Sequence, residues 1–302
     1  MRWSEQRRAT MVMGLLTLLW GYSWIIAKLA LSQAGPFAFA ALRVLVGVVA
    51  IGAFLFITGH RPSRRPPRGA VAVGLVQTAA FLILNTWALS GGGAGKTAIL
   101  TFTMPCWVLL FAWPVLAERV VGVQWLAIGC ALGGLFSILE PWQLHARVLS
   151  ECLAVLAGMM WATGVVLTKR MQRETASDAL DFTFWQMAVG LVPMLVVAAL
   201  VPERAIAWTP LFVCAVLFSG AVSTALGWLM WQYVLTRLPA GTTSVASLAV
   251  PVIATVTGAL QLGERLRPAE ITGAALIALA LALMSWQSMR SHRRDDLSMA
   301  QE

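Results

Sequence analysis

Long apolar stretches with few polar interruptions make up most of this 302-residue chain. A helix needs about 20 apolar residues to cross the hydrocarbon core of a bilayer. Ten stretches of about this length lie at 9–31, 37–58, 70–90, 95–117, 122–140, 150–169, 181–201, 209–235, 240–262 and 268–288. Stretches 191–201 and 274–284 lack the alternation of polar and apolar positions that strands of a membrane barrel show. The pattern therefore predicts an all-α polytopic membrane protein with ten transmembrane helices.

One spacing of residues occurs twice within this pattern. Residues 94–119 and 240–265 both read Ala-Gly, nine residues, Pro, twelve residues and Glu-Arg. Trp20 and Trp161 also occupy equivalent positions in the two halves of the chain. Such self-similarity indicates an internal duplication.

The duplication divides the chain into two repeats of five helices. We assign residues 1–141 to the first repeat, 149–290 to the second and 291–302 to a tail. Because five is an odd number, the second repeat begins on the opposite side of the membrane from the first. Inverted repeats are typical of secondary transporters, whose substrate site lies near the midplane between the halves. The sequence thus predicts a central cavity between two inverted repeats.

Basic residues are concentrated in alternate loops. The chain has 22 Lys and Arg against 13 Asp and Glu, a formal net charge of +9, although only 12% of its residues are charged. The largest basic group lies at 61–68, and others precede the first apolar stretch and follow the last. By the positive-inside rule, these loops and both termini are cytoplasmic. The charge therefore reflects topology and contact with the lipid bilayer, and we expect no nucleic-acid partner.

The two Ala-Gly…Pro…Glu-Arg frames resemble those of the drug/metabolite transporter superfamily, specifically its ten-helix EamA-type members. The aromatic residue seven positions before each frame, Trp87 or Tyr233, and the segment LRVLVG at 42–47 carry the same resemblance. It implies two intertwined five-helix halves around a cavity lined mainly by the first, third and fourth helices of each repeat. Many bacterial members export amino acids or related metabolites, and others carry nucleotide sugars, triose phosphates or drugs.

Pro105 and Pro251 lie near the middle of the fourth and ninth predicted helices. Proline removes an intrahelical hydrogen bond and kinks a helix, so we expect both residues in bent walls of the cavity. The alternative is a kink that serves helix packing alone.

Tryptophans are a second group of candidates for the cavity. Trp20 and Trp161 lie near the centres of their helices, where an indole N–H needs a partner. Trp24 shares a helical face with Trp20, and Trp228 shares one with Trp231. We expect these five side chains to line a cavity for apolar or cationic groups, the alternative being packing between helices.

Arg43 lies about two turns into the second predicted helix, too deep for contact with lipid. It either binds the carboxylate of a substrate, or serves as a gate or as a structural tie to helix ends, and we favour the tie. Its counterpart in the second repeat is Gln186, which is also polar. Lys28 lies near a helix end, and we expect its ammonium group to extend to the membrane surface.

Asn85, Thr101 and Ser244 are candidate hydrogen-bond partners for a zwitterionic substrate. All three lie within predicted helices of the third or fourth position of a repeat. Polar residues at such positions also hold helices to one another, so both roles remain open.

Candidate chemistry of other kinds is absent from the sequence. The acidic residues and the three histidines fall in loops, in tails or at the edges of predicted helices. Proton-coupled transporters keep an ionisable residue within the membrane, so we expect facilitated or weakly coupled transport. The four cysteines show neither a disulfide nor a metal-binding spacing. We expect no catalytic residue, no metal and no cofactor, and therefore no enzyme.

The leading hypothesis is a transporter that exports amino acids or related small amphipathic metabolites by alternating access. The alternatives are an exporter of drugs or cationic compounds, a carrier of nucleotide sugars or sugar phosphates, a membrane enzyme, and a receptor or scaffold. We expect the protein in the inner membrane of a bacterium, with both termini in the cytoplasm. Its expected partners are a small-molecule substrate and the bilayer, and a monomer is sufficient.

Overall fold

The computed structural model describes residues 2–117, 120, 122–139, 148–174, 178–235 and 249–299. Every regular element in these ranges is helical, with η marking π-helical turns. The elements are α1 (Arg2–Ala30), α2 (Pro36–Ile57), α3 (Ala70–Val73), η1 (Gly74–Ala80), α4 (Phe81–Gly91), α5 (Ala94–Thr101), α6 (Met104–Leu116), α7 (Val123–Leu139), α8 (Val148–Glu174), α9 (Ala179–Leu200), α10 (Pro210–Leu217), η2 (Phe218–Leu226), α11 (Gly227–Leu235), α13 (Ala249–Leu262) and α14 (Pro268–Met299).

Helices occupy all ten positions at which the sequence predicts a membrane span. Seven helical segments of the described ranges are long and apolar enough to cross a membrane. Shorter apolar helices at Val123–Ile138, Ala249–Leu262 and Pro268–Leu283 take the remaining positions. The predicted ninth span begins at residue 240, and its first part lies outside the described residues. The prediction of an all-α polytopic membrane protein is confirmed.

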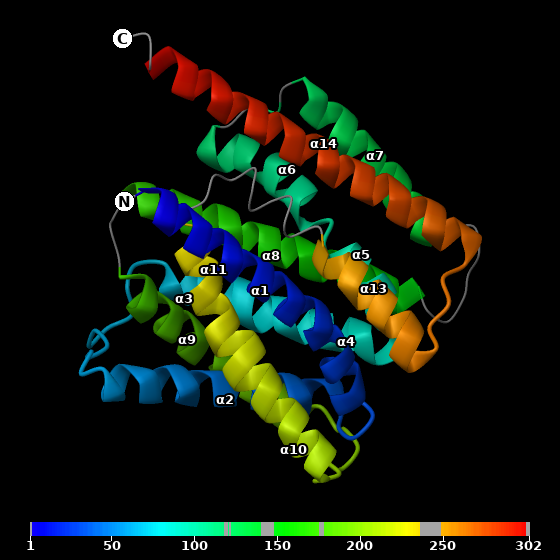
Figure 1. Cartoon of the computed structure of the whole chain (residues 1–302). Helices are drawn as coiled ribbons and strands as arrows, with labels where there is room; N and C mark the ends of the chain where they lie inside the picture. Colours follow the sequence, from blue (N-terminus) through cyan, green and yellow to red (C-terminus); the bar gives the residue numbers. More distant parts are fainter. Residues whose placement is uncertain are drawn as a thin grey trace.

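The two repeats are intertwined, and the main contacts between different helices of the two repeats occur in equivalent pairs. The second helix of each repeat packs on the third helix of the other, as α2 on η2 and α9 on η1. The first helix of each repeat packs on the fourth helix of the other, as α1 on α13 and α8 on α5 and α6. The fifth helices, α7 and α14, pack on one another at the periphery (Figure 1).

Two glycines allow the second and third helices to cross closely. A Cβ atom on Gly220 of η2 would lie 2.6 Å from the carbonyl oxygen of Arg43 in α2. In the equivalent crossing, a Cβ atom on Gly74 of η1 would lie 2.5 Å from the carbonyl oxygen of Gln186 in α9. Both distances are too short for any side chain, so these crossings place backbone against backbone.

We expect Gly220→Ala to lower the free energy of unfolding by about 1–3 kcal/mol, because an added methyl group forces α2 and η2 apart. Thermal unfolding in detergent measures this effect as a lower melting temperature. Gly14→Ala is the matched control, since no atom lies within 4 Å of a Cβ placed on Gly14. An equal melting temperature for the two variants would contradict the close crossing.

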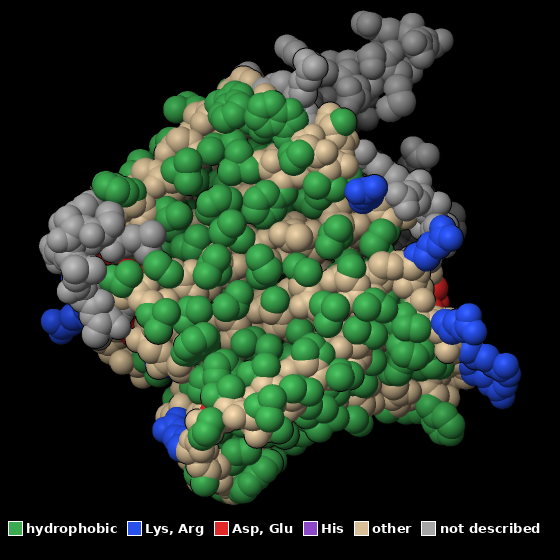
Figure 2. All heavy atoms as spheres, turned by 180° about the vertical axis from the view of Figure 1, so that it is seen from behind, with side chains coloured by type: hydrophobic (Ala, Val, Ile, Leu, Met, Phe, Trp, Pro, Cys, Tyr) green, Lys and Arg blue, Asp and Glu red, His purple; other side chains and the backbone are tan. Residues whose placement is uncertain are grey.

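The outer surface of the helices is apolar. Large hydrophobic side chains such as Phe56, Leu260 and Ile57 are exposed. Figure 2 shows hydrophobic side chains spread over one face, with Lys and Arg at its edges. A contiguous apolar surface of this kind is unfavourable in water and matches the hydrocarbon core of a bilayer.

Candidate functional site

A cavity lies between the two repeats, among the first and third helices of both, α2 and the end of α5. Its volume is about 70 Å³. The residues that line it are Trp20, Ser23, Trp24, Ala27, Arg43, Phe81, Leu82, Asn85, Leu89, Phe102, Trp161, Ser223 and Trp228. None of these described lining residues is acidic. Sites for small molecules commonly enclose about 300–1,000 Å³, so a substrate would have to separate the walls.

Aromatic rings from both repeats meet in this cavity. The ring centroid of Trp161 lies 5.2 Å from that of Phe81, 5.4 Å from that of Phe102 and 6.0 Å from that of Trp20. Trp228 lies 5.9 Å from Trp20 and 6.3 Å from Trp161. The structure thus brings together Trp20 and Trp161, which the duplication relates, with Trp161 at the centre of the group.

The two equivalent indoles differ in hydrogen bonding. Nε1 of Trp20 donates to the carbonyl oxygen of Ser223 over 3.0 Å. Nε1 of Trp161 has no acceptor among the described residues, although the side chain is only 4% exposed. A buried N–H group without a partner is costly. A ligand in the cavity that carries a hydrogen-bond acceptor would satisfy it.

Arg43 ties two helices together and also lies at the cavity. Its Nε and Nη2 donate to the hydroxyl oxygen of Thr224 in η2 over 3.2 and 3.0 Å, so it ties α2 to the other repeat. Gln186 makes the equivalent tie, since its Nε2 donates to the hydroxyl oxygen of Thr78 over 3.3 Å. Arg43 also lines the cavity. No carboxylate of the described residues pairs with it, so its positive charge has no protein counterion there.

The hydrogen bonds of Arg43 and Gln186 both end on π-helical turns, which the sequence did not predict. η1 and η2 occupy the same place in the third helix of each repeat. A π-helical turn frees backbone carbonyl groups and is common at functional sites. Ser223 illustrates this, because its carbonyl oxygen accepts the indole N–H of Trp20. The sequence signal was the pair of polar dipeptides, Gln77-Thr78 and Ser223-Thr224, each shortly after a glycine in mid-span.

Asn85 and Thr101 are neighbours, but only Asn85 lines the cavity. The hydroxyl of Thr101 donates to Oδ1 of Asn85 over 3.2 Å and lies 3.5 Å from the carbonyl oxygen of Ala154 in α8. Thr101 is fully buried. It therefore holds Asn85 and α8 in place from behind and is not among the residues that line the cavity.

The two prolines and Trp231 are likewise not among the residues that line this cavity. The fourth helix is interrupted at residues 102–103, where Phe102 lines the cavity, and Pro105 lies in the first turn of α6 after this break. Pro251 is buried within the packing of α13. Trp231 packs behind Trp20, with 5.7 Å between ring centroids. Ser244 lies outside the described residues.

One end of the bundle is closed by contacts between helix ends. We call it the distal end: α1 and α4 end there, and α2, α5, α8 and α14 begin there. Nζ of Lys28 lies 2.7 Å from the carbonyl oxygen of Leu89 and 2.5 Å from that of Gly92, at the end of α4. Lys28 therefore joins the end of α1 to the end of α4.

Carboxylates of the second repeat bind the first turns of helices in the first repeat at this end. Glu264 accepts hydrogen bonds from the backbone N–H groups of Ala94 and Gly95 over 2.6 and 3.1 Å. Glu203 accepts those of Phe37 and Ala38 over 3.0 and 2.8 Å. Carboxylates complement the positive ends of helix dipoles, so these contacts hold the two repeats together.

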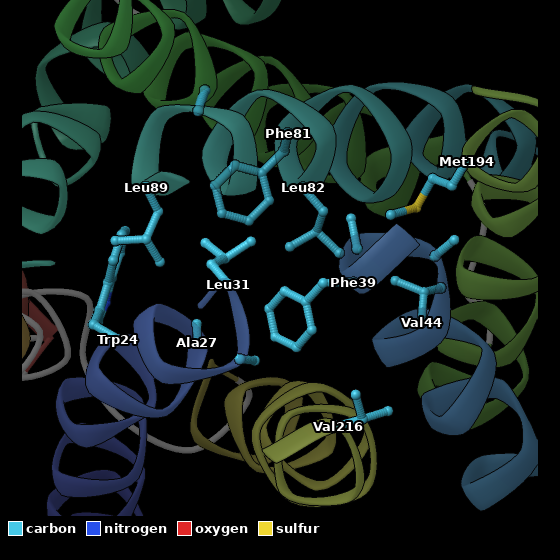
Figure 3. Packing of buried hydrophobic residues seen from close by; sticks show 14 of the residues in the cluster. Trp24, Ala27, Leu31, Phe39, Val44, Phe81, Leu82, Leu89, Met194 and Val216 are labelled. Carbon is cyan, nitrogen blue, oxygen red and sulfur yellow. The ribbon is translucent and has the colours of Figure 1, made fainter. Parts of the chain in front are cut away.

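An apolar layer separates the cavity from the distal end. Leu31, Phe39 and Leu89 are buried there, Leu31 directly after α1 and the other two near the distal ends of α2 and α4. Figure 3 shows Leu31 and Leu89 together with Phe81 and Leu82, which point from α4 toward α1 and α2. Buried apolar side chains and helix-end contacts therefore both lie on the distal side of the bundle.

Comparison with known proteins places this architecture in a family. The family model described as the EamA-like transporter family matches residues 8–140 and 148–286. The chain is 27% identical to the uncharacterized transporter YoaV of Bacillus subtilis, covering 91% of this chain and 96% of that protein. A crystal structure of a protein with 18% identity has a TM-score of 0.66, covering 94% of this chain and 99% of that one.

Two further relatives have names that state a substrate. The chain is 25% identical to a probable amino-acid metabolite efflux pump of Escherichia coli, covering 88% of this chain and 91% of that protein. It is 24% identical to a probable terminal-alkyne amino-acid exporter of Streptantibioticus cattleyicolor, covering 95% of this chain and 96% of that protein. With both halves matched, this chain belongs to the EamA-like transporter family of multi-pass membrane proteins.

Proposed function

We propose that this protein exports amino acids or related amphipathic carboxylates across a bacterial inner membrane by alternating access. The observation that carries the proposal is a central cavity with aromatic walls, one guanidinium group and no described acidic residue. The efflux pump and the exporter among its relatives support an amino-acid substrate.

The polar groups of the cavity favour a carboxylate. Arg43 supplies a positive charge, and Trp161 supplies an N–H group without a partner. Arginine binds carboxylates through two parallel hydrogen bonds, of which one or both would replace its contact with Thr224. The apolar part of the substrate would lie against Trp20 and Phe81.

The same groups disfavour the alternative substrates. A cationic drug would meet the charge of Arg43 without a carboxylate among the described lining residues to balance its own. A nucleotide sugar carries two phosphate charges on a large molecule, whereas this cavity offers one arginine and about 70 Å³. An amino acid requires the smallest displacement of the walls.

The charge distribution and the contacts at the distal end support an orientation in the membrane and a direction of transport. The basic loop at 61–68 lies at the opposite end of the bundle from Glu203 and Glu264. By the positive-inside rule, we assign that basic end and both termini to the cytoplasm and the distal end to the outside. Opening of the distal contacts would release the substrate outward. The cavity lies within one chain, so a monomer is sufficient for this cycle.

Counterflow in proteoliposomes tests the proposal. Vesicles loaded with an unlabelled compound take up the labelled compound transiently only if the protein carries it. We expect counterflow of apolar amino acids such as leucine and phenylalanine, and none of cationic dyes or nucleotide sugars. Dye counterflow without amino-acid counterflow would support the drug exporter. Binding of amino acids without flux would support a receptor.

A further inference from the structure

An apolar groove lies on the outer surface of the bundle, apart from the central cavity. It runs between α2 and the continuous helix formed by η2 and α11, with the start of α1 beside it, and its volume is about 460 Å³. Its walls include Ala50, Ile51 and Phe54 of α2, Ala225 and Leu229 of the η2–α11 helix, and Val12 of α1. Every described lining residue is apolar except Tyr233, which is amphipathic. The groove is therefore suited to a hydrocarbon group.

The groove forms because its two long walls touch at one point and diverge beyond it. α2 and η2 cross closely at Gly220, next to the carbonyl oxygen of Arg43. α11 continues η2 but moves away from α2 (Figure 1). Past the crossing the two walls present Ala50 and Ala225. Methyl groups are too small to fill the space between diverging helices at the density of a protein interior.

In the orientation proposed above, the groove faces the cytoplasmic half of the bilayer. Figure 1 shows that α1 begins, and α2 and α11 end, on the same side of the bundle. Phe54 lies in the last turn of α2 and is 49% exposed, and Tyr233 lies in the last turn of α11. Tyrosine is enriched where its ring meets hydrocarbon and its hydroxyl meets water. The acyl chains of the inner leaflet are therefore the apolar groups that reach this groove.

Arginines without acidic partners lie just beyond the cytoplasmic end of the groove. Arg8 precedes Val12 by four residues and so shares its face of α1. Arg61 follows the end of α2 by four residues. The loop from Arg61 to α3 also contains Arg64, Arg65 and Arg68. All of these side chains are exposed, and none pairs with a carboxylate of the described residues.

The acidic side chains described at this end do not balance these charges. Those of Asp178 and Asp181 lie at the start of α9 and accept the backbone N–H groups of Leu180 and Ser63. Clusters of about four to eight basic residues directly beside a membrane span attract anionic lipids. A hydrocarbon groove with positive charge at its end thus matches the two parts of one molecule, a phospholipid whose headgroup has a net negative charge.

We propose that this groove is a binding site for an anionic phospholipid of the inner leaflet. One acyl chain lies between Ala50 and Ala225, and the phosphate is held by Arg8 and Arg61. The inference uses the proposed orientation in the membrane but not the proposed substrate.

The two walls of the groove are also walls of the substrate cavity. α2 contributes Arg43 to the cavity, and the η2–α11 helix contributes Ser223 and Trp228. An acyl chain between these helices holds them at a fixed separation on the cytoplasmic side of their crossing. The bound lipid therefore stabilises the folded arrangement around the cavity without entering it.

Thermal unfolding in detergent with added lipid tests the charge of the headgroup. A molecule that binds only the folded protein raises its melting temperature. We expect phosphatidylglycerol to do so at about tenfold lower concentration than phosphatidylcholine with the same acyl chains, and Arg61→Gln to weaken the effect of phosphatidylglycerol about fivefold. Arg265→Gln is the matched control, because Arg265 is an exposed arginine at the distal end, and it should behave as wild type. Equal effects of the two lipids on wild type would overturn the proposal.

A variant that fills the groove tests the place of the acyl chain. Ala50→Phe puts a ring where the chain lies and should weaken the effect of phosphatidylglycerol at least fivefold. Ala278→Phe adds the same ring to an exposed position of α14 and should leave the effect unchanged. If Ala50→Phe responds to phosphatidylglycerol as wild type does, the headgroup binds without the groove and the site is wrong.

Photo-crosslinking locates the lipid in the wild-type protein, even if a variant fails to fold. Phosphatidylglycerol with a diazirine group in one acyl chain should label residues 50–54 and 225–233 more strongly than phosphatidylcholine with the same group. Equal labelling by both lipids would mean that any acyl chain fills the groove. No labelling there by either lipid would mean that something else covers it, such as a second copy of the chain. Either result would overturn the proposal, and neither depends on whether leucine is transported.

Discussion

Arg43→Gln is expected to lower amino-acid export at least tenfold while the protein still folds. Glutamine at the equivalent position, Gln186, makes the same tie to the other repeat through Thr78, so the substitution preserves the tie and removes the charge. A hydrogen bond to a charged group contributes about 1.5–3 kcal/mol, and about 1.4 kcal/mol corresponds to a factor of ten. Leucine uptake against concentration in proteoliposomes, together with the melting temperature, measures both effects.

Gln186→Arg provides the comparison for this prediction. It would place a charge at the equivalent position, where Gln186 contacts Gln77 and Thr78 but is not among the lining residues. We expect a loss of stability there without a gain in affinity for leucine. Wild-type leucine kinetics in Arg43→Gln would mean that Arg43 serves only as a tie between helices.

Trp161→Ala is expected to lower the affinity for leucine about tenfold or more and to change which amino acids are exported. The indole of Trp161 contacts the rings of Trp20, Phe81, Phe102 and Trp228. Its removal opens the cavity wall. It also removes these aromatic pairs, each of which contributes about 0.5–1.5 kcal/mol beyond the area that it buries. Competition of a panel of amino acids with labelled leucine measures the change, and large aromatic amino acids should gain relative to leucine.

Two further variants separate the parts of this effect. Trp161→Phe keeps a ring but removes the N–H, and should weaken leucine binding by about twofold to tenfold, the contribution of one neutral hydrogen bond. Trp113→Ala removes an exposed indole that contacts only Trp125 among the described aromatic rings, and should leave transport unchanged. If the same amino acids compete with labelled leucine to the same extent in Trp161→Ala and in wild type, the placement of Trp161 at the substrate is contradicted.

The fold was predictable because its determinants are local. Each apolar stretch is long enough to require a helix in a bilayer, and an odd number of helices per repeat requires inversion. The structure also explains part of the repeated frame. Gly95 is small because a Cβ atom there would lie 2.7 Å from the Cα atom of Thr255 in α13, and Glu264 of the second frame binds the N–H groups of Ala94 and Gly95. Glu118 and residues 240–241 lie outside the described residues.

The cavity was predictable only in part. Repeat symmetry identified Trp20 and Trp161, because equivalent positions in inverted repeats converge on the midplane. It did not identify Phe102, which lines the cavity at the break in the fourth helix, just before Pro105. Sequence position also could not show that Lys96, Glu151 and Glu270 meet, because they lie on helices that are distant along the chain and adjacent only after packing.

The most direct test of the central claim compares molecules that differ only in their charged groups. Leucine, its deaminated analogue 4-methylpentanoate and its decarboxylated analogue 3-methylbutylamine present the same apolar group to the cavity. If Arg43 binds the carboxylate, leucine and 4-methylpentanoate should both inhibit uptake of labelled leucine, and 3-methylbutylamine should not. Inhibition by the amine at the same concentration as leucine, without inhibition by the carboxylate, would contradict a carboxylate exporter.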